Sequence, residues 1–173
     1  LKNKLSEQEN VNIVERDLAN DSLAHLTQTE MQAWATPVDE RSKEQQQFAA
    51  ISDNLIAELK TSDTIVLAMP MYNFGVPSTF KAWADRVARA CVTFRYTEDG
   101  PVGLLENKQV IVLAARGGQH AGTASDTQTP YLKTFFAFLG IEQSQFIYAE
   151  GLNMSGNEKR LAAAKQQIEN LSL

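Results

Sequence analysis

Short, almost uninterrupted apolar runs alternate with longer amphipathic stretches along this chain. Residues 64–69 (TIVLAM) and 110–114 (VIVLA) are apolar at nearly every position, and residues 145–149 (QFIYA) form a third such run. Runs of this length are typical of strands that are buried on both faces of a parallel sheet. The β-branched run at 11–18 (VNIVERDL) predicts a further strand, at the edge of the sheet.

The stretches between these runs carry apolar residues every three or four positions, as on the buried face of an amphipathic helix. The sequence therefore predicts helices at about 27–36 and 42–60, after Pro77, from Thr129 to Gly140, and over the last residues to about Leu171. Proline is favoured in the first helical turn, which fits both Pro77 and Pro130. Ser155 and Glu158 have the spacing of a capping box and predict the start of the last helix.

Cys91 continues the helical stripe that Phe80, Trp83 and Val87 begin. We therefore interpret it as a small buried apolar residue rather than a redox thiol. Beyond it, residues 92–105 hold two short apolar runs around an Asp-Gly turn signal, which predicts an excursion from the main sheet.

Strands that alternate with helices predict right-handed βαβ units. The expected fold is therefore α/β, a doubly wound parallel sheet with helices on both faces. The length suits one domain that covers residues 1–173. An open sheet of this type, with strand order 2-1-3-4-5, needs a central first strand. We expect that strand to lie before Leu1.

The composition narrows the classes of function. Lys and Arg number 16 against 21 Asp and Glu, and the net charge of -5 argues against binding to nucleic acid. One cysteine and two histidines exclude a disulfide within the chain and the usual zinc ligand sets, so we expect no metal. The single cysteine suits a reducing cytoplasm, where we expect the protein. No run approaches the roughly 18 apolar residues of a membrane span, so we do not expect it to enter a membrane.

Ligands of such sheets bind outside the carboxyl ends of the strands. The loops that follow three of the expected strands cover residues 70–77 (PMYNFGVP), 115–125 (ARGGQHAGTAS) and 150–155 (EGLNMS). All three are rich in glycine, aromatic or hydrogen-bonding residues. We therefore expect the functional site at this edge of the sheet.

The first of these loops places Met71, Tyr72, Asn73 and Phe74 where a turn usually carries small polar residues. Flat and soft side chains suit stacking against a flat ligand, and an Asn amide can both donate to and accept from the edge of a heterocycle. Gly75 allows the backbone to approach a ligand closely. The alternative is that Tyr72 and Phe74 only cover the edge of the sheet.

The second loop contains Arg116, Gly117 and Gly118, whose backbone N–H groups can point at a polar ligand edge without side chains in the way. His120 belongs to a residue type that transfers protons near neutral pH, although a lone loop histidine is more often only hydrogen-bonded. The chain has neither a G-x-G-x-x-G nor a G-x-x-x-x-G-K-[ST] motif, which argues against a dinucleotide Rossmann site and a P-loop. The chain also lacks the G-x-S-x-G motif that exposes the nucleophile of many hydrolases, so a hydrolase is poorly supported.

Three strings of residues occur together in a characteristic order. They are residues 70–83 (PMYNFGVPSTFKAW), 93–96 (TFRY) and 116–118 (RGG). In sequence and spacing they resemble the bacterial FMN-dependent NADH:quinone oxidoreductases, also called azoreductases, over a region from about Val11 to Glu150. This resemblance implies a flavodoxin-like homodimer with one non-covalently bound FMN per subunit.

The resemblance also assigns roles to individual residues. It implies that the isoalloxazine ring is surrounded by Met71, Tyr72, Asn73, Phe74, Arg116, Gly117 and Gly118. His120 matches a histidine that lies near the flavin and is a candidate to support the chemistry. Tyr96 and Phe138 match aromatic residues that line the substrate pocket at the dimer interface, and residues 92–105 would reach toward the neighbouring flavin.

The implied reaction is a ping-pong scheme in which NADH and an acceptor stack in turn over the exposed flavin face. Hydride passes to flavin N5, and the electrons then reduce quinones to hydroquinones or cleave aromatic azo compounds. FMN carries the chemistry, so no catalytic side chain is required. The family often has serine where Ala115 stands, and its serine-rich phosphate loop is expected before Leu1.

Two other functions stay open at this point. One is a flavodoxin-like electron carrier without substrate turnover, against which the substrate-pocket aromatics Tyr96 and Phe138 count. The other is an acyl-carrier-protein phosphodiesterase, whose nucleophile and metal ligands are not apparent in the chain. The sequence does not distinguish NADH from NADPH, and it does not identify the physiological acceptor.

Overall fold

Three parallel strands form the centre of the molecule in the computed structural model, which describes residues 1–171. They are β1 (Thr64–Pro70), β4 (Gln109–Ala115) and β5 (Gln143–Ala149), in the spatial order β1-β4-β5. In register, Pro70 lies beside Ala115 and Ala115 lies beside Ala149. All three strands therefore end on one line, and the three loops that follow them start side by side.

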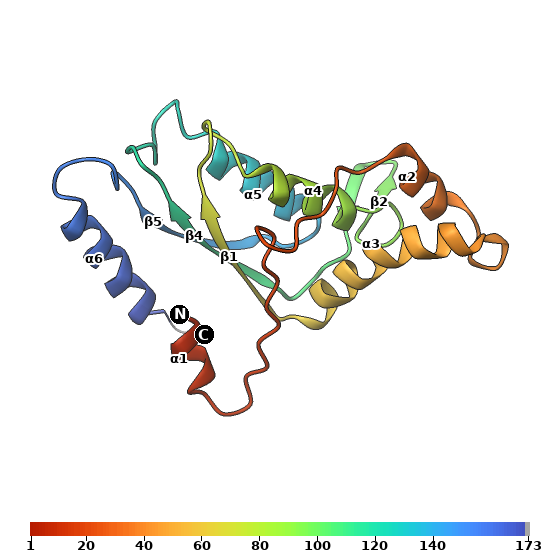
Figure 1. Ribbon diagram of the computed structural model, residues 1–173, viewed down its shortest axis with the longest axis horizontal. Coiled ribbons are helices and arrows are strands. Elements are labelled where there is room, and N and C mark those ends of the chain that lie inside the picture. Colours follow the sequence, from red (N-terminus) through yellow and green to blue (C-terminus); the bar gives the residue numbers. More distant parts are fainter. Residues whose placement is uncertain (172–173) are drawn as a thin grey trace.

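Helices cover both faces of this sheet. The described helices are α1 (Lys2–Ser6), α2 (Gln28–Ala35), α3 (Lys43–Thr61), α4 (Ser78–Val87), α5 (Gln128–Phe138) and α6 (Asn157–Glu169), with a short 3-10 helix at Val38–Glu40. Helix α2 packs on α3 and not on the sheet. Figure 1 shows α1 and α6 on one side of the strands and α4 and α5 on the other. Thr27 and Ser42 begin α2 and α3 with complete capping boxes, which satisfy N–H groups that a helix start otherwise leaves unpaired.

The two apolar cores follow from the alternation of side chains along β4. Val110 and Val112 are fully buried in a core with α3, α4 and α5, whereas Ile111 belongs to a second core with β5 and α6. Successive residues of a strand point to opposite faces, so a strand covered on both sides is apolar throughout. This confirms the predicted doubly covered parallel sheet.

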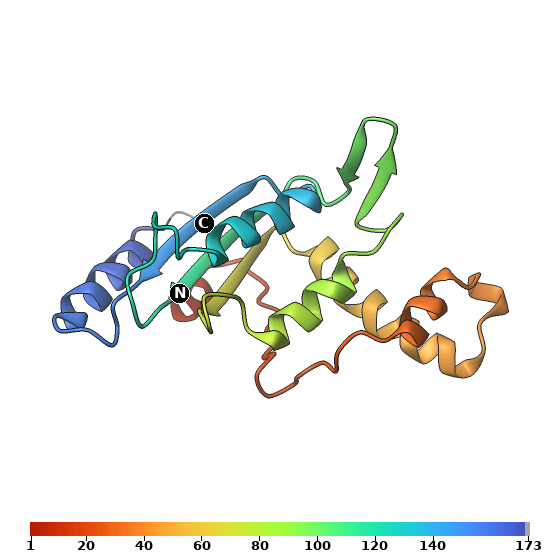
Figure 2. The same cartoon turned by 90° about the horizontal axis from the view of Figure 1, so that it is seen from above.

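The predicted excursion is an antiparallel hairpin of β2 (Phe94–Thr97) and β3 (Gly100–Gly103). Figure 2 shows it projecting away from the sheet and helices. Its base is tightly packed, because a Cβ on Gly103 would lie only 2.0 Å from the backbone nitrogen of Gly140, just after α5. The N–H of Leu105 also donates to the carbonyl of Leu139 at 2.9 Å.

The prediction of a strand at 11–18 is wrong for this structure, since these residues form no regular element. Val14, Leu18 and Ile65 of β1 line one hollow of about 160 Å³, but β1 pairs only with β4 among the described strands. A strand requires a neighbouring backbone within hydrogen-bonding distance. The segment makes no such hydrogen-bonded ladder with β1 in the described part of the chain.

The predictions for Cys91 and for the start of the last helix are also wrong. Helix α4 ends at Val87, because the hydroxyl of Thr93 donates to the Val87 carbonyl at 2.6 Å and accepts from the Arg89 N–H at 2.9 Å. Cys91 therefore lies outside the helix, exposed, with a φ of +62°. Helix α6 begins after Gly156, whose φ of +76° turns the chain so that no side chain caps the helix.

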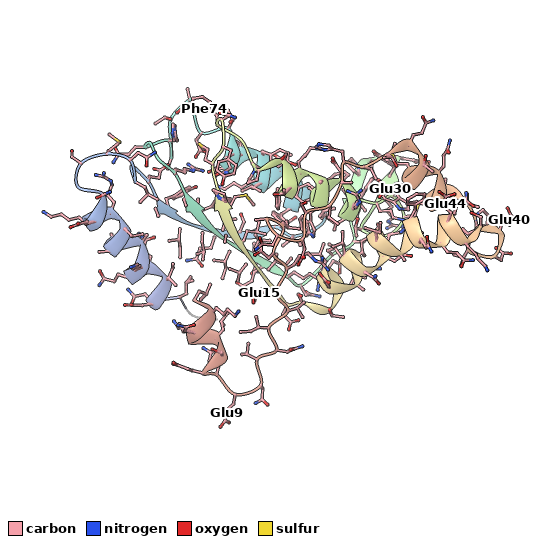
Figure 3. The ribbon with its side chains drawn as sticks, in the orientation of Figure 1. Glu9, Glu15, Glu30, Glu40, Glu44 and Phe74 are labelled. Atoms are coloured by element: carbon pink, nitrogen blue, oxygen red, sulfur yellow. The ribbon has the colours of Figure 1, made fainter. Side chains whose placement is uncertain are left out.

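A buried ion pair joins α2 to α4. Both Nε and Nη2 of Arg86 donate to the Glu30 carboxylate at 2.8 to 3.0 Å, and Nη1 donates to the Ala24 carbonyl at 2.6 Å. Both side chains are almost fully shielded from solvent. Figure 3 shows Glu30 between the ends of these helices, far along the molecule from Phe74 at the end of the sheet.

Candidate functional site

The three loops after β1, β4 and β5 are joined by backbone hydrogen bonds. The Met71 N–H donates to the Ala115 carbonyl at 3.0 Å, which links the first loop to the second. The carbonyls of Arg116, Gly117 and Gly118 accept from the N–H groups of residues 152, 153 and 151 at 2.8 to 3.1 Å. The expectation that the loops meet at one edge is confirmed.

Residues 72–75 form a tight turn at the end of β1. Tyr72 and Gly75 exchange two backbone hydrogen bonds of 3.1 and 2.9 Å, and the two residues between them, Asn73 and Phe74, have φ angles of +49° and +68°. A two-residue turn with both φ angles positive usually carries Asn followed by Gly. Phe74 occupies the glycine position, so its backbone is strained.

The aromatic side chains of this turn point outward. Tyr72 is 61% exposed and Phe74 is 55% exposed, so neither ring is packed as a cover over the sheet. Figure 3 shows Phe74 at the tip of the molecule, where β1 and β4 end. The arrangement presents flat apolar faces to a ligand.

Arg116 is turned into the protein instead of toward solvent. Its guanidinium donates to Glu150 at 2.9 Å, to Asp126 at 3.1 Å and to Thr129 at 2.9 Å, and its Nε donates to the Gln128 amide oxygen at 3.3 Å. The side chain is only 1% exposed. Arg116 therefore holds the loops together from inside the protein.

The pKa of Asp126 reflects these contacts. Burial alone would raise this pKa, but hydrogen bonds from Thr129, a hydrogen bond from Arg116 and the charge of Arg116 together hold it below its ordinary value. Asp126 is therefore a carboxylate that helps to fix the Arg116 side chain. It is not a proton donor for chemistry.

Sequence reasoning did not identify two residues that organise this edge, Glu150 and Gln128. One oxygen of the Glu150 carboxylate accepts from Arg116 and from the backbone N–H groups of His120 and Ala121, each at 2.9 Å. Gln128 is completely buried, and its amide nitrogen donates to two carbonyls of the first loop. An acidic residue that directly follows a buried strand was the available signal for Glu150.

Gly117 and Gly118 lack side chains for a steric reason. A Cβ on Gly117 would lie 2.6 Å from Nδ2 of Asn153, and one on Gly118 would lie 2.7 Å from Nε2 of His120. Within residues 1–171, the N–H groups of these two glycines make no hydrogen bond to the protein backbone. They are available as donors to a ligand.

His120 connects the second loop to the first. Its Nδ1 lies 2.8 Å from the Ser125 hydroxyl, and its ring meets that of Phe74 edge to face at 5.7 Å between centroids. The structure thus brings His120 and Phe74 together, as expected for residues of one site. Ser125 determines the orientation of the imidazole ring.

Tyr96 and Phe138 lie elsewhere in the same chain. Both pack on Phe94, with ring centroids 5.4 and 4.3 Å away respectively. Phe138 ends α5, about 15 Å along the helix axis from its start beside the loops, at 1.5 Å per residue. One copy of the chain therefore does not bring these two aromatics into the loop cluster.

Other features of the described chain add no second site of this kind. Within residues 1–171 no three His, Cys, Asp or Glu side chains are grouped as metal ligands, and no helix there combines the length and apolarity of a membrane span. A hollow of about 480 Å³ at the opposite edge of the sheet is lined by polar and charged residues such as Asp63, Glu106 and Glu142, without an aromatic side chain.

Comparisons with known proteins agree with this architecture. The family model described as the flavodoxin-like fold matches residues 1–171. The FMN-dependent NADH:quinone oxidoreductase of Alteromonas mediterranea is 55% identical over 161 residues, which are 93% of this chain and 80% of that protein. The enzyme of the same name from Alcanivorax borkumensis is 55% identical over 155 residues, or 88% of this chain and 78% of that protein.

A solved structure is similar over nearly the whole chain. The FMN-dependent NADH-azoreductase from Bacillus anthracis, in complex with FMN, superposes with a TM-score of 0.86 at 29% identity. The superposition covers 96% of this chain and 82% of that one. The chain therefore belongs to the flavodoxin-like family of FMN-dependent NADH:quinone oxidoreductases.

Proposed function

We propose that this protein is an FMN-dependent oxidoreductase that transfers two electrons from NADH to quinones and reductively cleaves aromatic azo compounds. Residues 1–173 act as one FMN-binding domain in this proposal. The observation that carries it is the meeting, at one sheet edge, of an exposed aromatic turn with unpaired backbone donors. The 55% identical relatives named NADH:quinone oxidoreductases support the quinone reaction, and the similar solved structure named NADH-azoreductase supports azo cleavage.

The groups at this edge fit a flavin ring. Its pyrimidine edge carries oxygen and nitrogen acceptors, and the free N–H groups of Gly117 and Gly118 are suitable donors. A Cβ on either glycine would collide with Asn153 or His120, so this arrangement of the donors requires glycine at both positions. Met71, Tyr72, Asn73 and Phe74 would hold the other side of the ring, and Arg116 and His120 would support the second loop.

FMN, when bound, supplies the two-electron redox chemistry. The residues of this chain bind and orient the reactants. The exposed rings of Tyr72 and Phe74 favour planar molecules through stacking. Because a nicotinamide and a quinone are both planar, they would compete for one face and bind in turn, which is the basis for a ping-pong scheme.

We also propose that the enzyme works as a homodimer. Tyr96 is 74% exposed, and Val102 and Leu104 on the same projecting segment are 41% and 37% exposed. Exposed apolar residues on a projecting hairpin are typical of an interaction surface. A second copy would bring Tyr96 and Phe138 of one subunit to the loops of the other, where they would line the substrate pocket.

Steady-state kinetics test the proposal. The protein is supplied with FMN, and NADH oxidation is followed while NADH and benzoquinone concentrations are varied. The proposal predicts turnover that requires both FMN and an acceptor, with parallel double-reciprocal lines, and loss of colour from an aromatic azo dye. Intersecting lines would contradict the ping-pong scheme, and FMN binding without turnover would indicate an electron carrier.

A further inference from the structure

The strained turn at 72–75 is held from outside by the start of α5. The hydroxyl of Thr127, the residue before the helix, donates to the Phe74 carbonyl. The amide nitrogen of Gln128 donates to the Gly75 carbonyl at 3.1 Å and to the Pro70 carbonyl at 2.9 Å. Two adjacent residues of one helix start therefore bind three carbonyls of the first loop.

These bonds act on a backbone that would otherwise relax. A bulky residue with a positive φ has a higher free energy than in an extended conformation, so Phe74 at +68° requires compensating contacts. The carbonyls held by Thr127 and Gln128 belong to Phe74 itself and to the next residue. The bonds are therefore placed where they oppose a reversal of the turn.

Gln128 also couples the first loop to the second. Its amide oxygen accepts from Nε of Arg116 while its nitrogen binds the first loop. The side chain is 0% exposed, so water cannot replace these bonds. A single buried amide thus fixes the separation between the aromatic turn and the loop with the free glycine N–H groups.

We propose that Thr127 and Gln128 are positioning residues that hold Asn73 and Phe74 in the left-handed conformation that the cofactor site requires. The consequence for FMN rests on the function proposed above. The conformational part does not, because the clamp is present in the chain alone. Neither residue touches the reacting atoms in this account.

Thr127 provides the cleaner test because its side chain is exposed, and a change there leaves the core intact. Thr127→Val keeps the shape of the side chain and removes the donor, whereas the control Thr127→Ser keeps the hydroxyl. At the buried position, Gln128→Glu keeps the acceptor for Arg116 and removes the donor to the two carbonyls. Urea unfolding verifies that each variant is folded.

Two measurements are made on each variant. Hydrogen exchange by NMR, on the FMN-free protein, reports the Tyr72 and Gly75 N–H groups that close the turn. Flavin fluorescence reports the Kd for FMN. Loss of one hydrogen bond predicts exchange about fivefold to tenfold faster in Thr127→Val and a Kd raised by a similar factor, with Thr127→Ser close to wild type.

A second change isolates the strain. Glycine adopts a positive φ without cost, so Phe74→Gly added to Thr127→Val is expected to restore slow exchange of the turn. Faster exchange with an unchanged Kd would overturn the positioning role, and unchanged exchange in Thr127→Val would overturn the clamp itself. If wild type binds no FMN, the proposed function and the cofactor part of this inference both fail, while exchange still decides the clamp.

Discussion

Replacing Arg116 by methionine would test whether this buried guanidinium organises the loop edge. The change removes four hydrogen bonds and leaves the carboxylates of Asp126 and Glu150, 7% and 14% exposed, without their cation. Removing one partner of a buried ion pair costs about 3–5 kcal/mol. With an m-value of about 2 kcal/mol/M, the urea midpoint should fall by about 2 M.

Arg160→Met is the matched control. Arg160 donates only to backbone carbonyls, among them those of Glu150 and Gly151 at 3.0 and 2.7 Å, so its loss strands no carboxylate. A cost of about 1–2 kcal/mol is expected. Unfolding is followed by the fluorescence of the buried Trp83.

The dependence on pH gives this prediction a second, independent readout. The pKa of Asp126 in the folded protein lies below its ordinary value of 3.8. Its contacts therefore stabilise the folded state above pH 3.8, and this stabilisation is lost as the pH falls through the folded pKa. The difference between wild type and Arg116→Met should therefore narrow below about pH 4. Equal losses in the Arg116 and Arg160 variants, or a difference that does not change with pH, would refute the reasoning.

Three further changes test other parts of the structure. Arg86→Met should lower the free energy of unfolding, measured with urea, by about 3–5 kcal/mol. The double variant Arg86→Met and Glu30→Met should lose less stability than the sum of the two single variants. Gly103→Ala should cost about 1–3 kcal/mol and displace the hairpin, because its Cβ meets the backbone at Gly140. Under the proposed homodimer, sedimentation should then detect a smaller dimer fraction. Gly118→Ala should displace the His120 ring and raise the Kd for FMN in a fluorescence titration by roughly tenfold, the equivalent of about 1.4 kcal/mol.

The sheet could be predicted from the sequence because burial on both faces leaves a strand almost no polar positions. The run at 64–69 ends one residue before β1 does, and the run at 110–114 is one residue shorter than β4 at each end. Strand β5 begins at Gln143, two residues before the predicted start, because Gln143 and Ser144 pair with β4 although they are polar. Backbone pairing, and not side-chain type, determines that boundary.

The errors share a cause in hydrogen bonds that the pattern of apolar and polar residues does not show. Cys91 fits the helical stripe, but Thr93 ends α4 first through two hydrogen bonds of its hydroxyl. The segment at 11–18 has the composition of a strand but forms no ladder with β1, which pairs only with β4 among the described strands. The local sequence pattern contains no information about the hydrogen bonds of Thr93 or about which segments pair with β1.

The sequence predicted which loops form the candidate site, but it did not predict the hydrogen bonds that join them. Exposed aromatics and glycines after buried strands indicated the loops. Gln128 was missed because a polar residue in the first turn of a helix is usually at the surface, whereas here it is completely buried between two loops. The positive φ of Phe74 was equally invisible, because a bulky residue rarely adopts this conformation and its residue type gave no sign of it.

Whether the loops at this sheet edge form an FMN-dependent redox site can be decided from the visible spectrum of the protein with FMN. The spectrum is recorded under anaerobic conditions, first with NADH and then with benzoquinone. The account predicts a bound flavin that NADH bleaches and that the quinone restores to its oxidised spectrum. A bound flavin that NADH does not bleach, or a protein that binds no FMN, would contradict it.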